Sequence, residues 1–172
     1  MQLSDDDFTL FQLPRRFALD AADLAERWKG LQAAAHPDRF AGEGAAAQRL
    51  AMQWAVRINE AYQRLKQPVS RGAYLCELAG HAVQADSNTA MPAAFLMQQM
   101  AWREGLEEAR RADEVDALAD EVGRARRELI EALRASIDAR ADWIQATAQV
   151  RALMFIDRFQ RDVDRRLAAL EQ

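Results

Sequence analysis

The sequence has 172 residues, of which half are apolar and only seven are glycine and four proline. This composition is typical of a mostly helical soluble protein, and the length suffices for one or two small domains. The net charge of −4 argues against a nucleic-acid-binding protein, which needs a basic face. The single cysteine, Cys76, excludes an internal disulfide and any multi-cysteine metal site. No apolar run reaches membrane-spanning length and no signal-peptide pattern opens the chain, so we expect a cytoplasmic protein without a membrane partner.

The first half of the chain predicts two long helices that form an antiparallel hairpin. Asp20 caps the first helix, which has to end at His36 because Pro37 excludes helical backbone from the residue before it. The second helix runs from about Ala46 to Lys66. Apolar residues recur in both at spacings of three and four, so the two stripes can pack against each other. The stripes are Leu24, Trp28 and Leu31 in the first helix, and Leu50, Trp54, Ile58, Ala61 and Leu65 in the second.

A short helix is expected on either side of this hairpin. Ser4 can cap the first one, and Pro14 stops it. Pro68 breaks the chain after the hairpin, and Ser70 can cap the helix that follows. Residues 81–91 then lack any periodicity, so we expect a domain of residues 1–80 and a linker of residues 81–91.

Three long helical patterns follow in residues 92–172. The first begins at Pro92 and runs to about Ala109, the second is opened by Asp113, and the third covers about 143–170. The junction at 138–142 contains neither glycine nor proline, so one continuous helix is an alternative. Burying two such long apolar stripes favours a chain that folds back into a three-helix bundle.

The tripeptide His36-Pro37-Asp38 falls in the loop of the predicted hairpin. It has four interpretations: a turn that ends a helix, a catalytic dyad, a metal pair, or a recognition tip. A catalytic dyad needs a nucleophile, and Cys76 lies among apolar residues, where a thiol is inert. The chain has only one other histidine, His81, so a histidine metal site would be poor.

The helix after Pro92 is apolar on two faces. On a helical wheel, one arc forms the stripe for its own bundle and consists of Phe95, Gln99, Trp102 and Leu106. The opposite arc consists of Leu96, Met97, Met100, Glu104 and Glu108. Because one face suffices for the bundle, we interpret the second as a protein-binding surface, the alternative being a further layer that covers it. In the last helix Met154 and Phe155 are candidates for positions off the core stripe, unless they pack on a neighbouring helix.

Taken together, the first half resembles a J domain and the whole chain resembles the HscB family of J-type co-chaperones. The J-domain likeness covers residues 6–80, with Ile58 to Tyr62, Arg71 and Tyr74 matching its pattern beside the tripeptide. The HscB likeness depends on four motifs: Phe-Thr-Leu-Phe-x-Leu-Pro at Phe8–Pro14, His-Pro-Asp-Arg-Phe at His36–Phe40, Phe-Leu-Met at Phe95–Met97, and Arg-Glu at Arg103–Glu104.

This resemblance implies a function and two sets of contact residues. J domains stimulate ATP hydrolysis by DnaK-class chaperones, here HscA, and the HscB bundle binds the iron–sulfur cluster scaffold IscU. The implied chaperone-binding residues are His36, Pro37, Asp38, Arg27, Lys29 and Arg39. The implied scaffold-binding residues are Leu96, Met97, Met100, Glu104, Glu108 and Phe155.

We therefore expect an all-α protein with an N-terminal J domain and a C-terminal three-helix bundle. It would be a monomeric, non-enzymatic co-chaperone without a cofactor or bound metal. It would deliver IscU to HscA and so aid the maturation of iron–sulfur proteins. One alternative is a general J-domain co-chaperone that presents unfolded clients to DnaK. The other is a small enzyme that uses His36 and Asp38 as acid and base.

Overall fold

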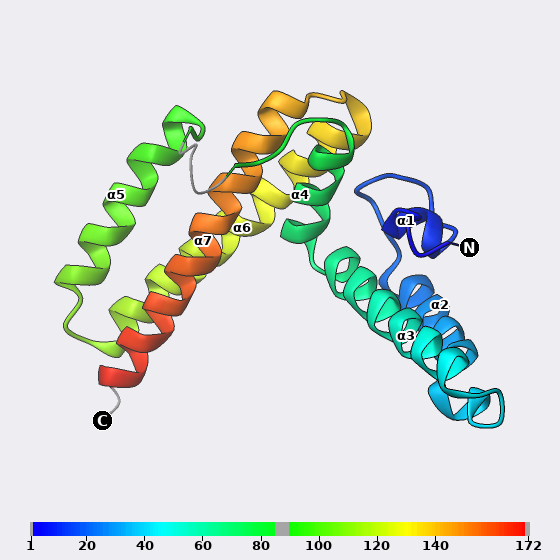
Figure 1. The fold of residues 1–172 in the computed structure, drawn as a ribbon. Helices are drawn as coiled ribbons and strands as arrows, with labels where there is room; N and C mark the ends of the chain where they lie inside the picture. The colour runs from blue at the N-terminus through cyan, green and yellow to red at the C-terminus, as the bar shows by residue number, and fades with distance from the viewer. Residues whose placement is uncertain (1, 85–89, 171–172) are drawn as a thin grey trace. The chain divides into compact units, whose positions relative to one another are not determined.

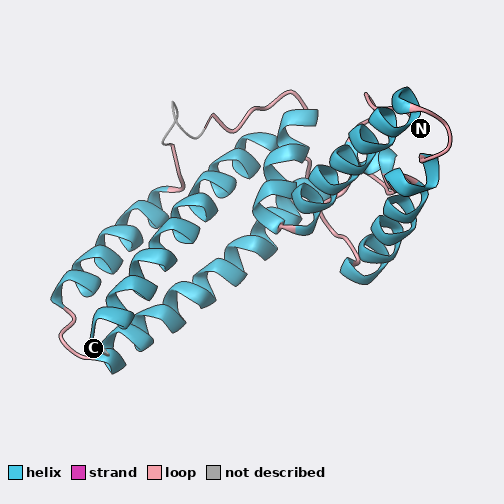
Figure 2. Cartoon of the chain, turned by 60° about the horizontal axis from the view of Figure 1, so that its bottom comes forward, coloured by secondary structure: helices cyan, strands magenta, loops and turns pink. Residues whose placement is uncertain are grey.

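The computed structural model describes residues 2–84 and 90–170, in which the chain is helical and contains no strand (Figure 1 and Figure 2). The predicted all-α class is confirmed. The chain divides into two compact units, residues 1–75 and 76–172. The first holds α1 (Asp7–Leu10), α2 (Ala21–Ala34), the 3₁₀ turn η1 (Pro37–Phe40), α3 (Ala45–Lys66) and most of α4 (Pro68–Leu78). The second holds α5 (Ala93–Glu108), α6 (Ala112–Arg134), the π turn η2 (Ala135–Ala139) and α7 (Trp143–Leu170).

Helices α2 and α3 form the predicted antiparallel hairpin (Figure 1). The Asp20 carboxylate accepts the N–H groups of Ala22 and Asp23, as expected for its cap. Trp28 of α2 stacks on Tyr62 of α3 with ring centroids 4.6 Å apart. At the tip the chain reverses through Gly44, whose φ is +91°. Glycine adopts such a left-handed backbone conformation at no steric cost.

Leu50 departs from the predicted stripe of α3. Its side chain is 49 % exposed, whereas Ile58, Ala61 and Leu65 further along the helix are fully buried. The difference arises at the tip of the hairpin, where the end of α2 presents the small side chains of Ala34 and Ala35.

The first helix is shorter than predicted and has a different cap. Asp6, not Ser4, accepts the N–H groups of Phe8 and Thr9 through its carboxylate. The helix also ends before Pro14, because Gln12 takes a left-handed conformation with φ +55°.

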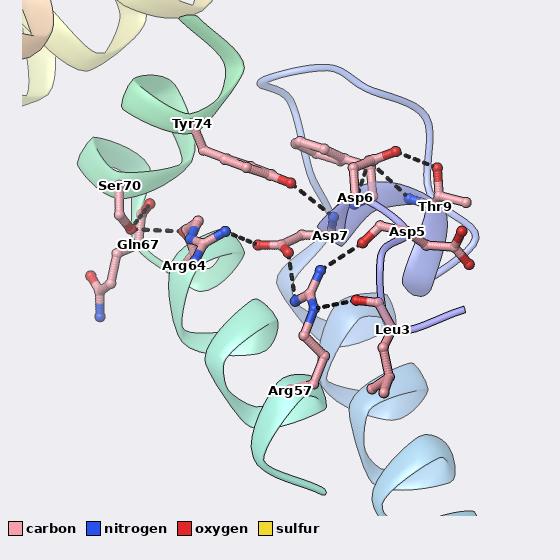
Figure 3. A network of polar contacts seen from close by, with 11 residues as sticks. Leu3, Asp5, Asp6, Asp7, Thr9, Arg57, Arg64, Gln67, Ser70 and Tyr74 are labelled. Carbon is pink, nitrogen blue, oxygen red and sulfur yellow. Dashed lines mark hydrogen bonds and ion pairs between the residues drawn. The ribbon is translucent and has the colours of Figure 1, made fainter. Parts of the chain in front are cut away.

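Asp7 connects this short helix to α3 and α4 (Figure 3). Its fully buried carboxylate lies 2.8 Å from the guanidinium of Arg57 and 3.0 Å from that of Arg64. The backbone N–H of Asp7 donates to the hydroxyl of Tyr74 at 3.1 Å. A buried carboxylate is stable only when it is paired, and here two cations from α3 pair with it.

Helix α4 begins at Pro68 itself, so the predicted order of breaker and cap is wrong. Proline suits the first turn of a helix because an N–H group at that position has no acceptor within the helix, so its absence costs nothing. The Ser70 hydroxyl donates to the carbonyls of Arg64 and Gln67 instead of accepting an N–H group (Figure 3). The bond to Arg64 ties the start of α4 to the end of α3.

The second unit is the predicted three-helix bundle of α5, α6 and α7 (Figure 1). The turn between α6 and α7 is confirmed: Ala141 has φ +49°, and the Asp142 carboxylate accepts the N–H of Gln145 at 3.0 Å. The core is made of aromatic and branched side chains from all three helices: Phe95, Trp102, Val115, Val122, Phe155, Ile156, Phe159 and Val163.

The helix starts of the bundle differ by a residue from the prediction. Pro92 is the cap residue of α5 and not its first helical residue. Helix α6 begins at Ala112, and the Glu114 carboxylate accepts the N–H groups of Arg110 and Arg111 at 2.8 and 3.2 Å. A glutamate at this position caps the start of a helix. This role was predicted for Asp113 from the sequence.

Arg151 attaches the residues between α4 and α5 to α7. This buried arginine donates to the carbonyl of Val83 at 2.8 Å and to that of Ala90 at 2.6 Å. The middle of the predicted linker, residues 85–89, lies outside the described residues. None of the described helices combines the length and apolar character that a membrane span requires.

Candidate functional site

The tripeptide lies at the tip of the hairpin with its side chains accessible. His36 is the cap residue of η1, and its Nδ1 accepts the backbone N–H of Asp38 at 3.3 Å. The same Nδ1 lies 3.6 Å from Asp38 Oδ2. The His36 side chain is 58 % exposed and that of Asp38 is 90 % exposed. The tip therefore presents a carboxylate, an acceptor-only anion, to any cationic partner.

In the described residues no metal cluster accompanies the tripeptide, and the single cysteine is buried. Within residues 2–84 and 90–170, no group of three or more histidine, cysteine or acidic side chains is placed to hold a metal ion. Burial raises the pKa of the Cys76 thiol to about 11, against a smaller opposing effect of the Arg151 charge. At neutral pH this thiol stays protonated and is a poor nucleophile.

The three predicted basic contacts are placed differently from one another. Arg27 is half-buried: it pairs with Asp23 at 2.8 Å and donates to the carbonyls of Phe11 and Gln12. The guanidinium of Arg39 is exposed and donates to the carbonyl of Ala33 at 3.3 Å. Lys29 is exposed on α2. Arg27 thus holds the end of α1 against α2, which leaves Lys29 and Arg39 as the more accessible charges.

An apolar groove of about 320 Å³ adjoins the tripeptide. It opens between the end of α2 and the first half of α3, and Ala35 and Phe40 on either side of the tripeptide contribute to its wall. The groove exists because the alanines at the end of α2 leave space beside Leu50 and Trp54.

The outward face of α5 is the second candidate site. Leu96, Met97 and Met100 are 39, 76 and 69 % exposed, and Glu104 and Glu108 continue the same side of the helix in exposed positions. Phe95 and Trp102 on the opposite side are buried. The prediction that α5 has one face in the bundle and another in solvent is confirmed.

Phe155 is not on this surface: of the two positions left open for it, off the core stripe or packed on a neighbouring helix, the structure shows the second. Its side chain is only 7 % exposed. It packs edge-on against Phe95 at 5.7 Å and stacks on Phe159 at 5.9 Å, and the Arg103 guanidinium lies 5.3 Å from its ring centroid. Phe155 therefore holds α5 on the bundle from beneath. Phe155 is buried, unlike the exposed methionines of α5, because α5 itself covers it. A helical wheel of α7 alone does not reveal this contact.

Two structural residues were missed by the sequence analysis. Arg151 and Asp7 are buried charges whose partners lie far away in the sequence: Val83 and Ala90 for Arg151, and Arg57 and Arg64 for Asp7. A charged residue inside an otherwise apolar stripe is the available signal for Arg151. Asp7 had none, because a run of aspartates before a helix already has an explanation as a cap.

Comparisons with known proteins cover nearly the whole chain. Residues 91–164 match a family model described as the HSCB C-terminal oligomerisation domain. The chain is 48% identical over 161 residues to a "Co-chaperone protein HscB homolog" of Bordetella pertussis, which covers 93% of this chain and 95% of that protein. A homolog with the same description from Burkholderia vietnamiensis is 48% identical over 174 residues, covering 99% of both.

Two solved structures agree with the fold. The chaperone HscB from Vibrio cholerae superposes with a TM-score of 0.82 at 34% identity, covering 96% of this chain and 99% of that one. The human co-chaperone protein HscB superposes with a TM-score of 0.88 at 24% identity, covering 95% and 83%. The second likeness concerns the fold alone.

Proposed function

The chain belongs to the HscB family of co-chaperones, and we propose that it joins two partners, the DnaK-class chaperone HscA and the iron–sulfur cluster scaffold IscU. It stimulates ATP hydrolysis by the chaperone, delivers the scaffold to it, and so aids the maturation of iron–sulfur proteins. In this proposal residues 1–80 act as the J domain, 81–91 as the linker and 92–172 as the scaffold-binding bundle. The hydrolysis chemistry belongs to the chaperone, and this chain binds one conformation of that partner better than another.

The observation that carries the proposal is that each compact unit exposes one surface of a different chemistry. The first unit presents the Asp38 carboxylate on a proline-stiffened turn. A carboxylate of this kind pairs with an arginine of the partner, and a turn fixed before docking lowers the ordering cost. Arg39 adds an exposed positive charge next to Asp38 in the chain, Lys29 is a further exposed charge on α2, and Arg27 supports the fold of the hairpin.

The α5 face supports the second half of the proposal. Methionine side chains adapt to the shape of a partner, and Met97 and Met100 are the most exposed members of this face. Glu104 and Glu108 border it with negative charge, which suits a scaffold with a basic rim. Phe155 contributes by keeping α5 in place, since its ring lies beneath Phe95.

The experiment that tests the chaperone site is the steady-state ATPase of HscA with increasing amounts of this protein. We expect wild-type protein to stimulate the rate. Asp38→Asn should lose at least tenfold in stimulation, because a charge-assisted hydrogen bond contributes roughly 1.5–3 kcal/mol. Glu77→Gln, which neutralises an exposed carboxylate near the end of α4, is the matched control and should behave as wild type. Full stimulation by Asp38→Asn would remove the chaperone site from the proposal.

A second candidate function follows from the methionines of α5. An exposed, adaptable apolar face also suits a general co-chaperone that presents unfolded clients to DnaK. Titrating the protein with folded IscU and with a reduced, unfolded model protein separates the two functions. The scaffold function requires tight binding to IscU alone, and the general function requires binding to the unfolded chain.

A further inference from the structure

We propose that His36 is a positioning residue: its neutral imidazole caps η1 through Nδ1 and thereby aims the Asp38 carboxylate at the partner. On this view the partner reads Asp38, and the ring of His36 maintains the turn on which Asp38 stands. The part of this inference that concerns chaperone stimulation rests on the proposed function. The part that concerns the turn does not.

The turn needs such a cap because it begins at a proline. The first N–H groups of any helical turn lack a partner within the turn. Pro37 has no N–H, so the first donor that needs a partner is the backbone N–H of Asp38. The Nδ1 of His36 accepts it at 3.3 Å, and the carbonyl of His36 accepts the N–H of Arg39 at 3.0 Å. His36 thus satisfies two successive donors of the turn.

The cap requires one tautomer of His36. A ring nitrogen that accepts a hydrogen bond carries no proton, so we infer that the neutral imidazole carries its proton on Nε2. The carboxylate of Asp38, 3.6 Å from the unprotonated Nδ1, receives no proton from it. Asp38 consequently keeps its oxygens available, in agreement with its 90 % exposure.

The far side of the turn is held separately. The Arg39 guanidinium donates to the carbonyl of Ala33 in the last turn of α2, at 3.3 Å. His36, two residues before Asp38, and Arg39, the residue after it, are therefore both engaged with the chain. Asp38 stands between these two fixed residues, which is the arrangement that a rigid recognition group requires.

Two amide substitutions of His36 separate a cap from a direct contact. Asparagine places a side-chain oxygen on Cγ, where Nδ1 is attached, and is itself a good cap residue. Glutamine instead places its amide near the position of Nε2. We expect His36→Asn to stimulate HscA at about the wild-type concentration. His36→Gln and His36→Ala should need about fivefold more protein, which corresponds to about 1 kcal/mol for a lost cap.

Each other ranking of these variants overturns the proposal. If His36→Gln is active and His36→Asn is not, the partner reads Nε2 directly. If both lose stimulation equally, the imidazole itself is required, and if both keep it, the side chain of His36 has no role. Circular dichroism and thermal unfolding of each variant show that the hairpin itself is intact, so that a change in stimulation reports on the turn.

A second measurement tests the cap without any partner. Nitrogen-15 NMR of the free protein at a pH of about 8.5, where imidazole is neutral, distinguishes the two tautomers. We expect His36 to carry its proton on Nε2. The only other histidine, the exposed His81, is the internal reference. A His36 protonated on Nδ1, or with the same mixture as His81, would overturn the cap. This result holds even if wild-type protein fails to stimulate HscA, so failure of the proposed function is distinguishable from failure of the cap.

Discussion

In the N-terminal unit, single charged residues attach the short helix α1 to the rest of the unit. Asp7 is the clearest case, since its carboxylate is buried between Arg57 and Arg64 (Figure 3). A buried ion pair contributes little compared with an apolar replacement, but removing one member leaves the others unpaired. The stability of the unit therefore depends on Asp7, because its removal leaves both arginines without their counter-charge.

We expect Asp7→Asn to lower the free energy of unfolding by about 3 kcal/mol, because Arg57 and Arg64 lose the fully buried carboxylate that pairs with both of them. Urea unfolding followed by circular dichroism measures the change. The control is Asp23→Asn, which breaks a pair with Arg27 in which neither side chain is buried, and which should cost less than about 1 kcal/mol. Equal losses in the two variants would show that burial of the Asp7 pair has no energetic consequence.

Asp6 makes the stability of the same unit depend on pH in the acidic range. Burial raises its pKa, but hydrogen bonds from Arg15 and Thr9 outweigh this effect and bring the pKa down to about 2. The charged form is thus favoured more in the folded than in the unfolded state. The stabilisation is complete above the unfolded pKa of about 4 and is lost as the pH falls toward 2.

The variant Asp6→Asn tests this dependence, because asparagine still caps a helix but carries no charge. We expect its unfolding free energy to fall less steeply than that of wild type between about pH 4 and about pH 2. Chemical unfolding at a series of pH values provides the comparison. Parallel curves for the two proteins would contradict the assigned role of the Asp6 charge.

Among the helices, α5 is the one whose two faces have different roles in the proposed function. Its buried face joins the bundle through Phe95 and Trp102, and its other face exposes Leu96, Met97 and Met100. Exposed apolar side chains contribute little to folding, so their removal should affect binding more than stability.

The double variant Leu96→Ala, Met100→Ala should weaken binding to IscU by at least tenfold, since two apolar contacts of a binding surface together contribute roughly 2 kcal/mol or more. Its unfolding free energy should stay within about 1 kcal/mol of wild type. Ile144→Ala is the control, because Ile144 is an exposed apolar residue on α7, outside the α5 face, with 77 % of its surface accessible. Isothermal titration calorimetry measures all three proteins. Equal affinities for wild type and double variant would remove this face as the scaffold site.

The helix features that depend only on neighbouring residues could be predicted from the sequence. The cap at Asp20, the end of α2 before Pro37 and the two faces of α5 follow from spacing and backbone chemistry, and all were predicted correctly. The position of Phe155 stayed open between two alternatives because its burial depends on α5, which is distant in the sequence. Ser70 was misassigned because its hydroxyl can either donate or accept, and only the position of the Arg64 carbonyl decides between them.

For the candidate sites, the sequence predicted accessibility better than detailed contacts. The exposure of the tripeptide followed from its place in a hairpin loop. The bond between His36 Nδ1 and the Asp38 N–H depends on the geometry of one short turn, which a residue pattern does not specify. The commitment of Arg27 to the carbonyls of Phe11 and Gln12 depends on where α1 ends.

At the scale of the whole molecule, the two proposed sites belong to different compact units of one chain. The tripeptide lies in residues 1–75, and the α5 face lies in residues 76–172. Substitutions in one unit should leave the other site intact, because single-residue effects are independent when the residues share no contacts. In the proposed function, the covalent connection between the units is what brings the two partners together.

The most direct test of this account is how much ATP-bound HscA is retained by immobilised IscU, above the background measured without this protein. We predict that wild-type protein increases retention, and that neither Asp38→Asn nor the Leu96→Ala, Met100→Ala double variant does so. An equimolar mixture of the two variants should also fail, because each chain retains only one working site. Retention restored by the mixture, or supported by either variant alone, would contradict the claim that a single chain bridges the two partners.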